Sequence, residues 1–298
     1  MTTLRQQWLS TVTETASAGA RTQEGGCYLP DLCVMTFTGP ESADFLQGYL
    51  TCDISSLRDN ALQPWALCNL KGRVVANGWC TPERNGAVTL VTHRSLAEVL
   101  TDFFRPYLMF AKTELSLRSD DVLVFGFQRS PGPDALAVGA AGLDVGHYMR
   151  LVTDLPAATR TYDSYTHADA WHAMLIRGAT CLVTQQTSAT FLPQMLGLDT
   201  TGAVSFDKGC YLGQEVVARA QHRGTVKRRM HQLHWSGHKP QPGETLVTTD
   251  GKKSGAIVNA AATGEAEGLA LAVVTNETEY PLRTRREREH DTVLIQSH

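Results

Sequence analysis

Short strand patterns alternate with short amphipathic helix patterns along the first 226 residues, and this alternation limits the folds open to the chain. The strand patterns cover 28–38, 65–70, 74–80, 88–92, 113–117 and 122–127, and the helix patterns cover 40–50 and 95–104. A further helix pattern carries Trp171. Elements of this length and order predict an α+β fold rather than a parallel dinucleotide-binding sheet. The absence of GxGxxG and Walker motifs from the sequence agrees with that prediction.

The pattern changes after Lys227. Short strand patterns separated by Pro, Gly and Asn turns follow at 230–235, 244–248, 254–259, 268–274 and 292–295, and they predict a small β-barrel or sandwich. The chain is therefore expected to divide into 1–110, 111–226 and 227–298. The charged run that starts at Arg283 is expected to form a solvated turn between strands, with a partner-binding patch as the alternative.

The balance of charge and hydrophobicity excludes several classes of protein. Hydrophobic residues make up 42% of the 298 residues, so general disorder is not expected. A net charge of −3 does not favour nucleic-acid binding through bulk charge, although it leaves a local basic patch open. The N-terminal stretch MTTLRQQWLSTVTETASAG has no continuous apolar run, which predicts a cytoplasmic protein with no membrane partner.

The seven cysteines are scattered, and none belongs to a CxxC pair or to a Cys/His pattern with zinc spacing. We therefore expect no disulfide framework and no metal site. A small buried apolar side chain is the ordinary role of such a cysteine. Among the ten histidines, His172 and His222 are expected to be ordinary surface or interface residues.

Cys210 differs from the other cysteines because of its neighbours in the sequence. A helix pattern begins near Gln214, so Cys210 is expected just before a helix N-terminus, with Lys208 two residues away. The positive end of a helix dipole and a nearby ammonium both favour a thiolate. Gly209 and Gly213 would permit a sharp turn or a close approach to a ligand. The residues alone leave two roles open: a reactive thiol, or a buried cysteine in a glycine-rich turn.

The segment Lys-Gly-Cys-Tyr-Leu-Gly-Gln-Glu at 208–215 resembles the signature of the YgfZ family. The likeness continues through Val217-Ala218-Arg219 and into the basic residues that follow. Supporting blocks occur in the expected order, at 45–53, 71–73, 191–195 and 202–206. The resemblance thus covers most of the chain.

This resemblance implies the aminomethyltransferase (T-protein) fold, an α+β folate-binding fold with a small C-terminal β-barrel. It also implies tetrahydrofolate or a derivative as cofactor, and iron–sulfur proteins or their assembly factors as partners, with an indirect link to tRNA modification. Cys210 and Lys208 would be the reactive pair. The implied folate-binding residues are Trp171, Tyr211, Gln214, Glu215, Arg219 and Arg223. A second folate-associated tryptophan of some members is replaced by Leu32.

One departure leaves open whether the protein is an enzyme. True aminomethyltransferases resemble 72–77 but carry an acidic pair where this chain has Ala76-Asn77. Neither residue can act as an acid or base, so glycine-cleavage activity is not expected. A folate-dependent aminomethyl or methyl transferase remains an alternative. A tRNA-binding protein is the other, because a basic cluster follows the motif at Arg219, His222, Arg223, Lys227, Arg228 and Arg229.

Overall fold

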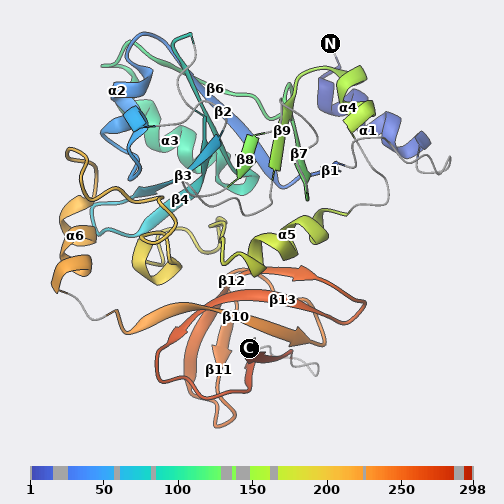
Figure 1. Ribbon diagram of the computed structural model, residues 1–298, viewed down its shortest axis with the longest axis vertical. Coiled ribbons are helices and arrows are strands. Elements are labelled where there is room, and N and C mark those ends of the chain that lie inside the picture. Colours follow the sequence, from blue (N-terminus) through green and yellow to red (C-terminus); the bar gives the residue numbers. More distant parts are fainter. Residues whose placement is uncertain are drawn as a thin grey trace.

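The computed structural model describes residues 2–15, 26–56, 61–81, 85–128, 136–138, 148–161, 167–223, 226–284 and 292–296. Figure 1 shows a helix-and-sheet part above and a barrel, formed by the C-terminal segment, below it. Helix α5 (Ala168–Arg177) lies between these two parts. The predicted α+β class with a C-terminal barrel is confirmed.

Nine strands form one sheet in the upper part, in the order β1-β7-β9-β8-β3-β4-β5-β2-β6. The strands are β1 (Cys27–Tyr28), β2 (Leu32–Thr38), β3 (Ala61–Cys68), β4 (Val74–Cys80), β5 (Ala87–His93), β6 (Glu114–Leu117), β7 (Leu123–Phe127), β8 (Leu136–Val138) and β9 (Tyr148–Val152). Strands from before and after residue 110 pair with each other, as β1 does with β7 and β2 with β6. The division into 1–110 and 111–226 stays a prediction.

The helices are short and cover the sheet or link it to the barrel. They are α1 (Leu4–Thr15), α2 (Ser42–Gln47), α3 (Ala97–Leu108), α4 (Leu155–Thr161), α5 and α6 (Gln214–Arg223). Between β3 and β5, every residue of β4 is buried, which suits a run of small and apolar side chains interrupted only by Asn77. Among the described residues, no helix is long and apolar enough to cross a membrane.

Six strands form the closed barrel, in the order β10-β13-β12-β11-β14-β15. They are β10 (Arg228–Ser236), β11 (Thr245–Val247), β12 (Lys253–Ala262), β13 (Glu267–Thr275), β14 (Leu282–Thr284) and β15 (Val293–Gln296). Pairing of β10 with β15 closes the barrel and leaves no free edge between them. Most of the charged run that starts at Arg283, residues 285–290, lies outside the described residues.

The barrel packs on the upper part through β13, which is buried on both faces. Ala270, Ala272 and Val274 point into the barrel core, whereas Leu269, Leu271 and Val273 join the large core that also contains residues of α5 and β4. Alternate residues of a strand face opposite sides, so an apolar run of this length serves two cores at once. The continuous hydrophobic sequence of β13 therefore fixes the barrel against α5.

Two asparagines reinforce this junction by holding the extended segment 181–183 from opposite sides. From β4, the Asn77 amide donates to the carbonyl of Cys181 (2.8 Å) and its Oδ1 accepts from the N–H of Val183 (2.7 Å). From β12, the Asn259 amide donates to the carbonyl of Leu182 (2.8 Å) and its Oδ1 accepts from the N–H of the same residue (2.8 Å). Each side chain supplies the donor and acceptor that a neighbouring strand would supply.

We predict that Asn77→Asp destabilises the fold by about 1–3 kcal/mol at neutral pH, because a carboxylate cannot donate to the buried carbonyl of Cys181. Urea denaturation measures the change. The matched control is Asn69→Asp, since Asn69 Oδ1 only accepts, from the N–H groups of Lys71 and Arg73, and a carboxylate keeps both bonds. Equal stability of the Asn77→Asp variant and the wild type would show that the Asn77 amide does not hold the segment.

Candidate functional site

Cys210 lies in the loop that precedes α6, and its side chain is exposed. The other six cysteines are all buried. Burial raises the pKa of several of these thiols, to about 12 for Cys27, Cys68 and Cys181. At neutral pH, Cys210 is therefore the thiol that reagents and partners can reach.

The loop that carries Cys210 is seated between α2 and the β3–β4 turn. Leu212 donates its N–H to the carbonyl of Gly48, just after α2. Gly213 has a φ of +81°, and a Cβ at this position would collide with the carbonyl of Asn69 in the β3–β4 turn. Only glycine fits such a left-handed, crowded position without strain. The second glycine of the motif therefore allows the loop to pack against β3–β4.

Lys208 anchors the other end of the same loop. Its buried ammonium donates to the carbonyls of Gln47 (2.7 Å), Leu50 (2.8 Å) and Cys52 (2.7 Å), at and beyond the end of α2. Burial lowers the pKa of Lys208, although the neighbouring Cys52, Asp53 and Cys80 side chains oppose this shift. An ammonium has three hydrogens, and these three carbonyls use them. The expected role of Lys208 as the cation beside Cys210 stays a prediction.

The remaining motif residues lie beside this loop or on α6. Tyr211 is buried, its ring lies 5.5 Å from the Lys208 ammonium, and burial raises its pKa to about 12. Glu215 and Arg219 are exposed on α6, Gln214 is half-buried at its start, and the side chain of Arg223 lies outside the described residues. Their expected contacts with folate stay predictions.

Trp171 is a core residue in this structure. Its side chain is 1% exposed and packs edge-on against Trp79, with ring centroids 6.1 Å apart. The backbone of Gly126 passes directly over the indole, and Leu32 is buried in the same cluster. A pterin would have to displace these neighbours to stack on the ring. The stacking role of Trp171 stays a prediction that the packing does not favour.

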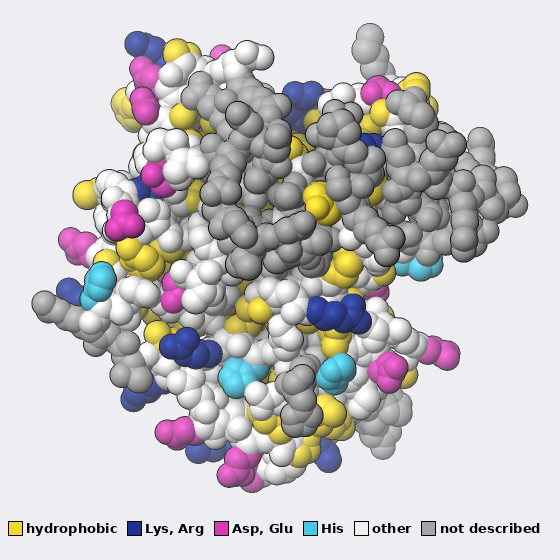
Figure 2. Space-filling view, viewed as in Figure 1, with side chains coloured by type: hydrophobic (Ala, Val, Ile, Leu, Met, Phe, Trp, Pro, Cys, Tyr) yellow, Lys and Arg dark blue, Asp and Glu magenta, His cyan; other side chains and the backbone are white. Residues whose placement is uncertain are grey.

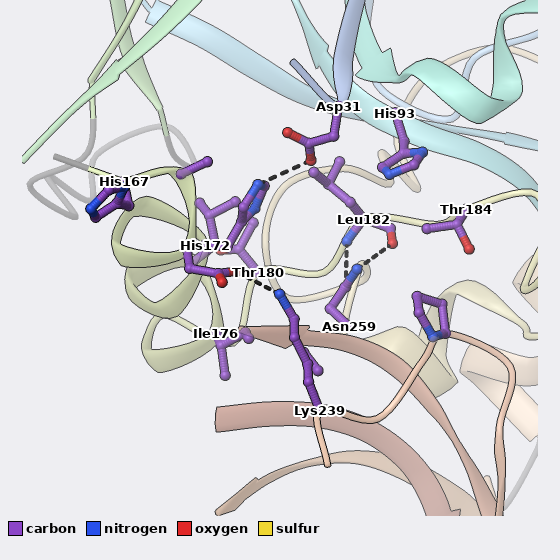
Figure 3. A pocket seen from close by; sticks show the side chains of 15 residues that line it. Asp31, His93, His167, His172, Ile176, Thr180, Leu182, Thr184, Lys239 and Asn259 are labelled. Carbon is purple, nitrogen blue, oxygen red and sulfur yellow. Dashed lines mark hydrogen bonds and ion pairs between the residues drawn. The ribbon is translucent and has the colours of Figure 1, made fainter. Parts of the chain in front are cut away.

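A cavity of about 500 Å³ opens between α5, the barrel and the upper sheet (Figure 3). Its apolar walls are Leu175 and Ile176 from α5, Leu182 from the clamped segment and Pro242 from the barrel. Its polar lining includes Asp31, His93, Asp169, His172, Lys239 and Asn259. Of the six residues expected to bind folate, the five whose side chains the structure describes do not line this cavity.

A histidine–aspartate hydrogen bond and a lysine–aspartate ion pair lie inside the cavity. His172 Nε2 lies 3.0 Å from Asp31 Oδ2, and the Lys239 ammonium lies 2.6 Å from Asp169 Oδ1. Burial by itself would raise the pKa of Asp31, but His172, with help from His93, brings that pKa below its ordinary value. Burial lowers the pKa of His93. Near neutral pH the cavity thus contains an ionised Asp31 beside an uncharged His93.

These cavity residues were not identified from the sequence. His172 was expected to be an ordinary surface or interface residue, and its position beside Asp31 was not predicted. They come from five segments that are far apart in the chain and share no motif. The described residues contain no group of three or more His, Cys, Asp or Glu side chains that could hold a metal ion.

Comparison with known proteins places the chain among relatives of a single kind. It is 31% identical to the "tRNA-modifying protein YgfZ" of Klebsiella pneumoniae over 279 residues, which cover 84% of this chain and 85% of the relative. It is 30% identical to the protein of the same name from Cronobacter sakazakii, over 90% of both chains. No family model matches.

The fold has a counterpart among solved structures. The glycine cleavage system aminomethyltransferase T of Bartonella henselae superposes with a TM-score of 0.66 at 13% identity, over 95% of this chain and 88% of the other. The predicted aminomethyltransferase fold is confirmed. The sequence identity and coverage of the first two relatives show that the chain belongs to the YgfZ family.

Proposed function

We propose that this protein binds a folate in the cytoplasm and serves the assembly or repair of iron–sulfur proteins, and through them tRNA modification, with Cys210 as its reactive group. One observation carries the proposal: the motif cysteine is the exposed thiol among seven. Its loop is held by Lys208 at one end and by the packing of Gly213 at the other. An exposed thiol in a fixed loop is suited to contact a partner protein or a sulfur species.

The cavity supports the folate part of the proposal. A volume of about 500 Å³ lies in the range for small-molecule sites, and its mixture of apolar walls and a few convergent polar groups is typical of them. Leu175, Ile176 and Leu182 could cover the faces of a flat heterocycle, while Lys239 could meet a carboxylate of the glutamate tail. When bound, a folate would supply or accept a one-carbon unit.

The competing aminomethyl-transfer function is not favoured by the structure around Asn77. This residue is 4% exposed, and both ends of its amide are bonded to the backbone of Cys181 and Val183. It has no titratable proton with which to assist transfer. Measured turnover with tetrahydrofolate and an aminomethyl-carrier protein would support the aminomethyl-transfer function instead.

A tRNA-binding function is supported by exposed Arg219, Lys227, Arg228 and Arg229 near the start of the barrel. The overall charge of −3 does not favour it. Binding of tRNA with a Kd below about 1 μM at physiological salt, weakening steeply as salt rises, would favour direct RNA contact over an indirect link to tRNA modification.

Cys210→Ser is expected to abolish support of iron–sulfur enzyme activity without unfolding the protein, because serine keeps the size of the side chain but supplies no thiolate near neutral pH. Complementation of a strain that lacks the native protein measures activity, and circular dichroism checks the fold. Brief alkylation followed by peptide mass mapping should label Cys210 alone in the wild type and nothing in the variant. Full complementation by Cys210→Ser would contradict the assignment.

Lys208→Met is expected to lower the free energy of unfolding by about 1–3 kcal/mol, because methionine fills similar space but leaves three carbonyls without a donor. Denaturant unfolding measures the loss. Lys112→Met is the control, since that ammonium lies at the surface, 3.4 Å from Glu41, with 79% of the side chain exposed. Equal losses of unfolding free energy in both variants would show that Lys208 does not anchor the loop.

Tetrahydrofolate is expected to bind the wild type saturably in a calorimetric titration. Lys239→Met should weaken this binding about tenfold, because Lys239 lines the cavity and methionine removes the ammonium that would meet a carboxylate of the tail. Trp171→Phe tests the indole separately, since it keeps an aromatic ring in the core. Unchanged affinity in Lys239→Met together with a loss in Trp171→Phe would place the folate at the tryptophan cluster rather than in the cavity.

A further inference from the structure

The cavity contains two carboxylates, and their surroundings differ. Asp169 lies in the first turn of α5, bonds to Lys239 and also lines a neighbouring pocket. Asp31 lies in the turn between β1 and β2 and lines the cavity together with His93. Figure 3 shows its carboxylate pointing into the cavity on the side opposite Lys239.

The turn that presents Asp31 is held rigidly by Arg94. The Arg94 guanidinium donates to the carbonyls of Pro30 (2.7 Å) and Leu32 (2.9 Å), on either side of Asp31. The backbone N–H of Arg94 donates to the carbonyl of Asp31 itself. All three bonds go to backbone, so Arg94 fixes the position of the aspartate and leaves the carboxylate to the cavity. Such preorganisation is typical of a group that recognises a ligand.

The carboxylate stays ionised and keeps acceptor sites on both oxygens. His172 bonds to Oδ2, and since each carboxylate oxygen can accept two hydrogen bonds, Oδ1 and Oδ2 can both accept from a group in the cavity. Leu182 and Leu175 provide apolar walls beside it. A carboxylate that a ligand reaches between apolar side chains is suited to bind a flat heterocycle. The edge of such a ring would have to carry two neighbouring N–H donors.

We infer that Asp31 is the specificity-determining residue of this cavity and recognises the paired N–H edge of a 2-amino-4-oxopyrimidine ring. This inference rests on the proposed folate function and places the pterin head at Asp31, with the tail directed toward Lys239. A guanine base carries the same edge, so the shared chemistry is that of pterins and guanines.

The test compares pterin with lumazine, which has a carbonyl oxygen where pterin has the 2-amino group. The wild type is expected to bind pterin roughly tenfold to a hundredfold more tightly than lumazine, because lumazine turns an acceptor toward the carboxylate. Asp31→Asn should abolish or reverse this preference, since an amide offers one donor and one acceptor. Guanosine, titrated in parallel, separates a pterin site from a guanine site. Calorimetry or ligand-detected NMR gives the affinities.

Two further variants separate recognition from stability. His172→Gln removes the imidazole but keeps the carboxylate, so it should keep the preference for pterin even where overall affinity falls. Asp121→Asn makes the same chemical change at a surface carboxylate 3.7 Å from Arg118 and should leave both affinities unchanged. Thermal unfolding shows which variants remain folded.

The outcomes distinguish this inference from the proposed function. If tetrahydrofolate binds and Asp31→Asn still prefers pterin, the role of Asp31 is overturned and the folate function stands. If tetrahydrofolate does not bind but pterin or guanosine is preferred through Asp31, the recognition stands and the folate function falls. If the wild type binds none of these compounds, both are overturned.

Discussion

The backbone of residues 181–183 is held between an asparagine from the sheet and an asparagine from the barrel, and much of the structure depends on this arrangement. Four hydrogen bonds of 2.7 to 2.8 Å join Asn77 and Asn259 to three consecutive residues. The segment pairs with neither sheet as a strand, so side-chain amides satisfy buried backbone groups that would otherwise be unpaired. Leu182, between the two amides, forms part of the cavity wall. The same bonds thus join the two parts of the molecule and shape the space between them.

This use of Asn77 has a chemical consequence. An aspartate at that position would be repelled by the carbonyl of Cys181, whereas an asparagine can both donate and accept. The chain has the fold of an aminomethyltransferase but uses this position for structure rather than for acid–base chemistry. A titratable group is found instead at Asp31, on another side of the cavity. The fold is therefore compatible with ligand binding without the transfer reaction of its structural counterpart.

The sequence predicted those features that depend on local pattern. The β3–β4 hairpin with its turn at Lys71-Gly72, the start of α6 at Gln214 and five of the barrel strands lie close to the expected places. The strand β14, Leu282–Thr284, was missed because it runs into the charged stretch from Arg283 that was expected to be a solvated turn. The acceptors of Lys208 could not be predicted, since they lie more than 150 residues earlier in the chain. The cavity residues could not be predicted for the same reason. Asp31 and His172 lie far apart in the sequence and come together only where the sheet and α5 pack.

The β3–β4 hairpin lies between the loop that carries Cys210 and the cavity. At its turn, the carbonyl of Asn69 lies against Gly213, three residues after Cys210. Farther along, Asn77 holds the backbone on either side of Leu182, which faces the cavity. No motif residue lines the cavity, so a folate bound there would not touch the thiol directly. Any influence of the ligand on Cys210 would have to pass through packed elements such as β4, which is buried along its whole length. The β3–β4 hairpin packs against the loop at Asn69 and is hydrogen-bonded on both sides of Leu182 through Asn77, so it is a physical link between the loop that presents the cysteine and the cavity wall.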